Sequence, residues 1–315
     1  MAPITDAYES RAAKDAAIII RRDPVVYTDL AVDTGSGVSR YQLEAYKRDG
    51  FMMLEKFFSA RETEALLEEV GRMVEDPEIA RREEAICEPG SNVVRSVFKV
   101  HAINRVLSRL SRDRRLVNIA KQIVGSEVYI HQSRANLKPG LFGKEFFWHS
   151  DFETWHVEDG MPNMRAVSCS ILLTDNTDSN GPLMIMGGSH HYFISCIGET
   201  PHDHYKESLR KQEYGVPDPD SLRFLADQGE IRSMTAPAGS VVFFDCNAMH
   251  GSNSNISPYP RCNLFFVFNS IENTLSDPRH GLNPRPEFIA TRQHCTAIKA
   301  VDPGYLRDVS KRNGD

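Results

Sequence analysis

The sequence predicts an α+β protein with an antiparallel sandwich or barrel of strands at its core. Helical patterns dominate the first part of the chain, whereas short β-branched and aromatic segments separated by turn residues dominate from Val128 onward. Helices followed by many strands are typical of this class. The chain has 315 residues, 41% of them hydrophobic, which is enough to bury a large core.

The N-terminal part of the sequence shows two clear helix signals. After a lead-in of about forty residues that mix Pro, Asp and Thr, a helix is predicted over Tyr41–Arg48, and Gly50 suits its left-handed C-terminal cap. Phe51–Leu54 then reads as a strand. Ser59 and Glu62 have the spacing of a capping box, so a second helix is predicted to follow them.

Further along the chain the pattern changes from helix to strand. A charged loop is predicted over Arg82–Val94 and one long helix over Asn104–Val124. His202–Gln228 is polar and reads as a long insertion between strands, and the residues after Asn273 read as a tail that wraps the core. The predicted strands share β-branched and aromatic residues, and they are Val128–Gln132, Arg134–Lys138, Arg165–Leu173, Leu183–Met186, Ser240–Phe244 and Cys262–Phe268.

Composition excludes several classes of function. A formal charge of -6 argues against general binding of nucleic acid or of an anionic membrane, since both need a basic surface. No stretch approaches the roughly 18 to 20 apolar residues of a membrane span, and no signal peptide is visible. The six cysteines are scattered and predict free thiols. We therefore expect a cytoplasmic protein with no nucleic-acid or membrane partner.

The densest chemistry lies in residues 146–160, which hold both tryptophans, two histidines and four acidic side chains. His149 and Asp151 are two residues apart, so on an extended segment they would point the same way. Two ligands would hold a metal loosely, and His250, just beyond an apolar strand, is the best candidate for a third. Two histidines and one carboxylate leave about three positions open, which is typical of non-haem Fe(II) oxygenases, whereas zinc more often takes other ligand sets.

Arg261 adds a second element to this pattern, because it lies 11 residues after His250 and opens an apolar strand. Its planar guanidinium grips a carboxylate with two hydrogen bonds. If 2-oxoglutarate chelates the iron through its keto-acid end, its far carboxylate would need such a clamp. The combination is more specific than any one part.

Simpler interpretations of each part remain open. His149 and Asp151 would also form an ordinary surface pair, His250 would also suit a core histidine, and Arg261 a sheet-edge ion pair. Three other pairs could supply metal ligands in place of His149 and Asp151. They are His156 with Glu158, His202 with His204 in the polar insertion, and His190 with His191, for which a structural turn is the alternative.

Residues 146–166 closely resemble the signature of the ectoine hydroxylases, bacterial members of the phytanoyl-CoA dioxygenase-like superfamily. The segment contains WHSDFETWH over Trp148–His156 and EDGMP over Glu158–Pro162. Ala248 departs from the family pattern, in which a threonine is expected. The resemblance covers nearly the whole chain and includes Asp49–Phe51, Gly187–His190, Phe244–Asn247 and Asn283–Pro286.

The resemblance implies a double-stranded β-helix, or jelly-roll, core with Fe(II) and 2-oxoglutarate. It implies O2-dependent hydroxylation of ectoine to 5-hydroxyectoine with release of succinate and CO2, in compatible-solute biosynthesis under osmotic stress, and a homodimer. It also implies one dioxygenase domain over residues 1–315. This domain would have a mainly helical part at 1–127, the core at about 128–275 with an insertion near 200–230, and a tail at 276–315.

The resemblance also implies roles for individual residues. His149, Asp151 and His250 would be the iron ligands. Arg261 would bind the distal carboxylate of 2-oxoglutarate, with help from Lys138, Phe146 and Ser252. Those lining the ectoine pocket would be Gln132, Thr154, Trp155, Phe244, Asn263, Phe268 and Arg285.

These roles suit ectoine, a small zwitterion with a delocalised cationic ring and a carboxylate. Trp155 or Phe244 would face the ring, Arg285 would pair with the carboxylate, and Gln132 and Asn263 would donate or accept hydrogen bonds. Ordinary strand residues are the alternative for each. For the two glutamates of the motif, Glu153 and Glu158, we expect structural hydrogen bonds or hydrogen bonds that orient the ligands.

Other functions remain open at this stage. One is a related dioxygenase that acts on another small zwitterion or on an acyl-CoA, and the polarity of the pocket separates these substrates. Another is a non-catalytic jelly roll that binds a metal or an osmolyte, and oxygen-dependent formation of succinate separates it from an enzyme.

Overall fold

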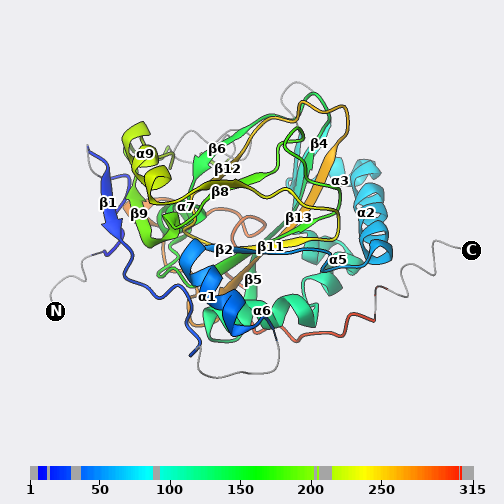
Figure 1. The fold of residues 1–315 in the computed structure, drawn as a ribbon, viewed down its shortest axis with the longest axis horizontal. Coiled ribbons are helices and arrows are strands. Elements are labelled where there is room, and N and C mark those ends of the chain that lie inside the picture. Colours follow the sequence, from blue (N-terminus) through cyan, green and yellow to red (C-terminus); the bar gives the residue numbers. More distant parts are fainter. Residues whose placement is uncertain are drawn as a thin grey trace, which may run out of the picture.

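The computed structural model describes residues 6–12, 15–29, 37–87, 93–201, 204–205, 215–304 and 306. A large and a small antiparallel sheet form a jelly roll, and helices cover the outer side of the large sheet (Figure 1). This is the fold class that the sequence predicted.

The large sheet has seven strands, and its central strands are buried along their whole length. Three of its strands come from the first 127 residues, so the predicted division at residue 127 does not coincide with an edge of the sheet. The predicted loop over Arg82–Val94 is also partly wrong, because it contains a strand. In sheet order the strands are β2 (Phe51–Leu54), β11 (Val241–Asp245), β7 (Ala166–Leu172), β13 (Arg261–Ser270), β5 (Val128–Lys138), β4 (Val94–Phe98) and β3 (Ala85–Cys87).

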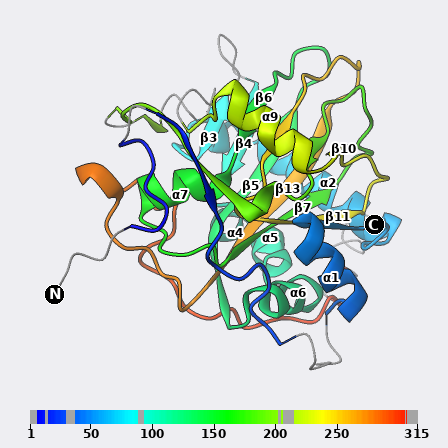
Figure 2. The same ribbon diagram turned by 60° about the vertical axis from the view of Figure 1, so that its left-hand side comes forward.

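Helices α1 (Arg40–Asp49), α2 (Ala60–Glu75) and α6 (Arg114–Val124) pack their apolar sides against the large sheet, as Figures 1 and 2 show. The predicted capping box that starts α2 is confirmed, and a second one starts α1. Gly50 ends α1 with a φ of 81°, the left-handed conformation that glycine tolerates best.

The single long helix predicted over Asn104–Val124 is wrong. The chain forms α5 (Arg105–Leu110) and then α6, because the Asp113 side chain accepts a hydrogen bond from the Arg115 backbone N–H and caps a new helix start. Two further short helices, α3 (Pro77–Ala80) and α4 (Val100–Ile103), lie nearby in the chain.

The small sheet faces the large one and has four strands. Its order is β10 (Ile231–Ser233), β8 (Leu183–Met186), β12 (His250–Ser252) and β6 (Phe146–His149). Helix α7 (Asp151–Asp159) follows β6. The two-stranded ribbon of β1 (Ala17–Ile20) and β9 (Tyr192–Ser195) lies beside α9 (Pro219–Gln228), a helix inside the predicted insertion, and 3-10 turns span Ser189–His191 and Arg279–Gly281.

Strand β5 is one continuous strand where the sequence predicted two. A bulge at His131 lets its side chains change faces. Before the bulge, Val128 and Ile130 face the helices. After it, the residues with even numbers from Gln132 to Lys138 face the small sheet. The bulge therefore converts an apolar strand into one wall of a polar cavity.

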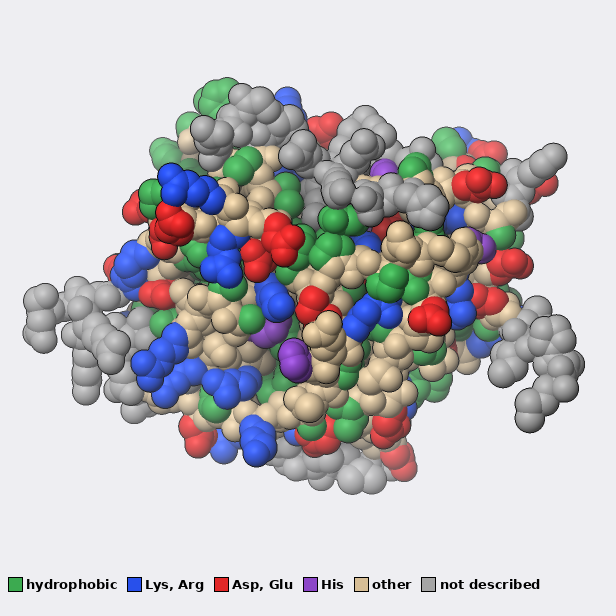
Figure 3. Space-filling view, turned by 180° about the vertical axis from the view of Figure 1, so that it is seen from behind, with side chains coloured by type: hydrophobic (Ala, Val, Ile, Leu, Met, Phe, Trp, Pro, Cys, Tyr) green, Lys and Arg blue, Asp and Glu red, His purple; other side chains and the backbone are tan. Residues whose placement is uncertain are grey.

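The surface is mixed in charge, and acidic and basic side chains lie side by side on the face shown in Figure 3. Among the described helices, none has the length and apolarity needed to cross a bilayer. All six cysteines are free thiols, as predicted.

Candidate active site

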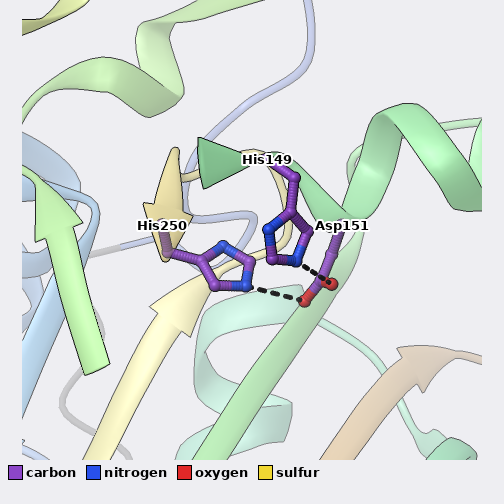
Figure 4. Close-up of side chains that lie close together, drawn as sticks. All are labelled: His149, Asp151 and His250. Carbon is purple, nitrogen blue, oxygen red and sulfur yellow. Dashed lines mark ion pairs between the residues drawn. The ribbon is translucent and has the colours of Figure 1, made fainter. Parts of the chain in front are cut away.

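Three side chains from different elements meet between the two sheets (Figure 4). His149 on β6 and His250 on β12 are direct cross-strand partners, and Asp151 is the first residue of α7. Nε2 of His149 lies 3.8 Å from Oδ1 of Asp151, and Nε2 of His250 lies 3.9 Å from Oδ2. One ligand atom from each residue lies within 4.8 Å of the other two, which suits a single shared ion.

The reason for this proximity differs from the one the sequence suggested. The segment is not extended through Asp151, because Ser150 ends the strand and accepts a hydrogen bond from the Glu153 backbone N–H, which starts α7. The Ser150 hydroxyl also donates to Oδ1 of Asn247 at 3.0 Å. A tight strand-to-helix turn, and not strand alternation, brings Asp151 beside His149.

Both imidazole rings are held in one orientation by the backbone. Nδ1 of His149 lies 2.8 Å from the Phe147 carbonyl, and Nδ1 of His250 lies 2.9 Å from the Ala248 carbonyl. A carbonyl only accepts, so each Nδ1 carries a proton and each Nε2 is the nitrogen that faces a shared ion. Burial, helped by the nearby His250, lowers the pKa of His149 to about 3, which keeps its imidazole neutral and able to ligate.

Arg261 lies at another part of the same cavity and is buried. It donates from Nη2 to Oδ1 of Asn136 at 2.7 Å and from Nη1 to the Gly181 carbonyl. Burial lowers its pKa to about 10, and none of the described carboxylates forms an ion pair with it. Lys138 lies beside it across the β5–β13 pair and donates to the Ser252 hydroxyl at 2.8 Å. This end of the cavity is therefore built for an anion.

Most of the predicted pocket residues line this cavity. The structure brings together the three metal-ligand candidates, the four residues expected to bind the co-substrate, and Gln132, Thr154, Trp155 and Arg285. Gln132 donates to the Ile289 carbonyl at 2.8 Å, which fixes its amide at the cavity wall.

Three predicted pocket residues do not line the cavity. Phe268 lies on the other face of β13, with Phe266 in the core under the helices. Phe244 packs in an apolar cluster with its ring 5.0 Å from the His250 ring. Asn263 lies between Arg261 and Phe265 on the site-facing side of β13, and its buried amide finds no hydrogen-bond partner among the described residues. Their roles at the substrate stay predictions.

Sequence reasoning missed several cavity residues on the neighbouring strands. Arg134 follows Gln132 on the same face of β5, and its guanidinium lies 4.8 Å from the centre of the Phe265 ring. It is half-buried, its Nε has no hydrogen-bond partner among the described residues, and burial of the guanidinium lowers its pKa. The two-residue repeat that links Gln132 to Lys138 was a signal that would have found it. The other missed residues lining the cavity include Arg95, Ser96, Phe98, Asn136 and Phe265.

The rival histidines of the sequence have structural partners. His156 makes hydrogen bonds with the Met161 carbonyl at 2.7 Å and with Asp6 at 3.0 Å. His190 lies in a 3-10 turn, as predicted for this pair, and makes a hydrogen bond with the Lys47 carbonyl at 3.1 Å. His202 lies outside the described residues, and His204 is buried.

Comparisons with known proteins agree with this geometry. The family profile described as Phytanoyl-CoA dioxygenase (PhyH) matches residues 46–262. The chain is 64% identical over 302 residues to a protein of Bordetella bronchiseptica named ectoine dioxygenase, covering 96% of this chain and 97% of that protein. A protein of the same name from Sphingopyxis alaskensis is 50% identical over 301 residues, with coverage of 96% and 97%.

Solved structures give the same result. The crystal structure of EctD from S. alaskensis with 2-oxoglutarate and 5-hydroxyectoine matches with a TM-score of 0.86 at 44% identity, covering 94% of this chain and 98% of that chain. The crystal structure of EctD from S. alaskensis with bound Fe matches with a TM-score of 0.84 at the same identity and coverage. The carbocyclase SnoK, at 20% identity and a TM-score of 0.58, shares the fold alone.

Proposed function

Because the chain belongs to the phytanoyl-CoA dioxygenase family, we propose that it is an Fe(II)- and 2-oxoglutarate-dependent dioxygenase that hydroxylates ectoine. The products are 5-hydroxyectoine, succinate and CO2, and the activity serves compatible-solute biosynthesis under osmotic stress. The observation that carries the proposal is one cavity in which two histidines and a carboxylate converge. In the same cavity lies the buried Arg261, which forms no ion pair with any described carboxylate.

The donor set suits a ferrous ion. His149, Asp151 and His250 offer two imidazole nitrogens and one carboxylate oxygen, and three such ligands would leave further positions on the ion for other groups. When bound, the iron supplies the chemistry that activates O2 at the expense of 2-oxoglutarate. The protein contributes the orientation of both imidazoles, through the Phe147 and Ala248 carbonyls.

The basic end of the cavity suits 2-oxoglutarate. Arg261 would hold the distal carboxylate with its fork of donors, while Asn136 and the Gly181 carbonyl keep the guanidinium in place. Lys138 and Ser252, already joined by a hydrogen bond, would add a charge and a hydroxyl. Phe146, whose ring centre lies 4.9 Å from that of His149, would cover the apolar middle of the keto acid.

Ectoine would bind between Trp155, Gln132 and Arg285. The Trp155 ring would face the delocalised cation of the substrate, and Arg285 would pair with its carboxylate. Oδ1 and Oδ2 of Asp159 hold Arg285 at 2.8 and 2.6 Å, so its guanidinium is fixed before substrate arrives. Such fixed groups place one C–H bond of a small, rigid substrate toward the metal site.

Most residues that line the cavity are polar or charged, which favours a small zwitterion over an acyl-CoA, since an acyl chain needs a long apolar tunnel. A panel assay tests this proposal. The iron-loaded protein is supplied with O2, 2-oxoglutarate and either ectoine, another small zwitterion or an acyl-CoA, and succinate is measured. We expect stimulation by ectoine, and stimulation by an acyl-CoA alone would contradict the substrate assignment.

We also propose that residues 1–315 work as one dioxygenase domain in a cytoplasmic homodimer. The six free thiols support a reducing compartment. Leu141, Phe142 and Tyr259 are large, exposed and apolar, and they lie on two loops joined by the hydrogen bond from the Leu141 N–H to the Ser257 carbonyl. They offer a surface for a second copy. Light scattering of the purified chain would contradict this part by giving the mass of a monomer.

A further inference from the structure

Residues 6–11, the N-terminal strap, lie across helix α7 and contact it through side chains. Asp6 pairs with His156, and Tyr8 packs edge-on against Phe152 with the ring centres 5.4 Å apart. The strap is also bound to the residue that follows strand β9, because the Arg11 N–H donates to the Cys196 carbonyl at 3.0 Å. Residues far from α7 in sequence thus form its cover.

Arg11 joins the two glutamates of the motif whose roles the sequence left open. Its Nε and Nη2 donate to the two oxygens of Glu153 at 2.9 and 2.6 Å, and its Nη1 donates to Oε1 of Glu158 at 2.6 Å. The Ser10 hydroxyl adds a 2.6 Å bond to Glu153. Arg11 is 3% exposed, Glu153 1% and Glu158 4%, so solvent does not screen these pairs.

The backbone conformation at Arg11 and the packing of Gly215 both support this contact. Arg11 has a φ of 58°, a left-handed conformation that is uncommon for a residue with a side chain. Gly215 packs directly over the Arg11–Glu153 pair, and a Cβ at this glycine would collide with both side chains. The contact is therefore built from three segments of the chain.

Two links run from Arg11 to side chains that line the cavity. Nη2 of Arg11 lies 3.3 Å from the Thr154 hydroxyl, and Thr154 faces the cavity. The second link passes through Glu158, because its Oε2 lies 3.5 Å from Nη1 of Arg285 while its Oε1 holds Arg11. Glu158 is thus divided between two guanidinium groups.

This division matters for the charge that Arg285 presents to the cavity. Asp159 already neutralises Arg285 through a two-bond pair, and Glu158 is a second carboxylate within reach. While Arg11 holds Glu158, that carboxylate stays at the longer distance from Arg285. If Arg11 were lost, a buried Glu158 would turn fully to Arg285, since a buried carboxylate needs a partner.

We propose that Arg11 is a positioning residue for substrate binding, which keeps the Glu158 carboxylate at its longer distance from Arg285. The strap thereby sets the affinity of the cavity for a substrate carboxylate. The inference rests on the proposed function, because it takes ectoine as the substrate whose carboxylate Arg285 binds.

A double-mutant cycle tests this inference on the iron-loaded, full-length protein. Arg11→Lys keeps a positive charge but loses the fork that spans Glu153 and Glu158. We expect the KM for ectoine to rise at least tenfold while kcat changes less than threefold. In an Arg285→Lys background the same change should alter the KM for ectoine less than twofold, since the group through which Arg11 acts is gone. The KM for 2-oxoglutarate and the iron content should stay the same.

Arg115→Lys is the matched control. Arg115 also joins two carboxylates from different segments, Glu62 and Asp113, but it does not line the cavity. We expect this variant to lose stability and to keep its KM for ectoine. If Arg11→Lys does not fold, Glu158→Gln tests the same link with the opposite expectation. It removes the carboxylate that would turn to Arg285, so the KM for ectoine should not rise, and a tenfold rise would contradict the inference.

Either of two results would overturn the inference. One is an unchanged KM for ectoine in Arg11→Lys, and the other is an equal rise of KM in the wild-type and Arg285→Lys backgrounds, which a merely structural role predicts. A wild-type protein that turns over 2-oxoglutarate without hydroxylating ectoine would instead contradict the proposed function, and the two failures are thereby distinguished.

Discussion

His149 and His250 face each other across the β6–β12 pair with their ring centres 4.2 Å apart, and both point Nε2 at Asp151. Two imidazole rings held this close by the backbone stabilise each other little. They gain much from a shared cation, and the carboxylate beside them adds the charge that a divalent ion favours. The relationship therefore indicates a metal centre more directly than a structural histidine pair.

The first prediction concerns these ligands. Replacing His149 or His250 by Ala should lower the iron bound after reconstitution and reduce turnover by about a hundredfold or more, since even residues that only orient ligands cost tenfold to a hundredfold. Metal analysis and product formation check it. His294→Ala, at an exposed histidine, is the control. Normal iron content in both ligand variants would remove these residues from the ligand set.

The second prediction concerns the co-substrate. Arg261→Ala should raise the KM for 2-oxoglutarate roughly thirtyfold, because a charge-assisted pair in a buried site contributes about 2 kcal/mol. Arg261→Lys keeps the charge without the fork and should show a smaller rise. The exposed Arg232→Ala is the control. Steady-state kinetics with saturating ectoine measures all three, and an unchanged KM in Arg261→Ala would reject the clamp.

The third prediction separates two phenylalanines on opposite faces of β13. Phe268 is fully buried under the helices, so Phe268→Ala should lower the free energy of unfolding by about 3–5 kcal/mol. Phe265 lines the cavity, so Phe265→Ala should raise the KM for ectoine with a smaller loss of stability. Denaturant unfolding and kinetics compare the pair. A larger effect of Phe268→Ala on KM than on stability would restore Phe268 to the pocket.

The sequence predicted the fold class and most helices and strands because their signals are local. The Ser59–Glu62 capping box and Gly50 specify helix ends within a few residues. The break at Asp113 was missed, since the apolar stripe continues through it. Strand β3 was missed because its few residues lie among charges, and its pairing partner β4 is what makes it a strand.

In the candidate site, too, some residues could be predicted from local sequence and others could not. His149, Asp151, His250 and Arg261 were predicted because their residue types and order suffice. Phe268 was placed in the pocket by resemblance. It is two residues from Phe266, so the two side chains share the face of β13 that packs against the helices. Structural hydrogen bonds were expected for Glu153 and Glu158, but their partner could not be predicted, because Arg11 lies more than 140 residues away in the chain.

The fourth prediction concerns pH. Burial, with a smaller contribution from Lys99, lowers the pKa of His101 to about 4, whereas an unfolded chain has a value near 6.5. Between pH 4 and 6.5 the His101 imidazole is therefore protonated more often in the unfolded state than in the folded state. The free energy of unfolding falls as pH drops from about 6.5 to 4. This group contributes a slope of up to about 1.4 kcal/mol per pH unit.

His101→Gln should remove this contribution to the slope, because the Gln side chain does not titrate. Gln still places a polar group near the Ser133 hydroxyl. Urea unfolding of the metal-free protein at pH 6.5, 5.5 and 4.5 measures the slope. The exposed His294→Gln should leave it unchanged. A His101→Gln slope equal to that of the wild type would contradict the prediction.

The most direct measurement of the whole account is the stoichiometry of one aerobic reaction. The purified chain is loaded with Fe(II) and supplied with 2-oxoglutarate and ectoine, and 5-hydroxyectoine and succinate are quantified together. The account predicts that both form in equal amounts, and that omitting iron, keto acid or oxygen abolishes both. Ectoine recovered unchanged from iron-loaded protein, with or without succinate, would contradict it.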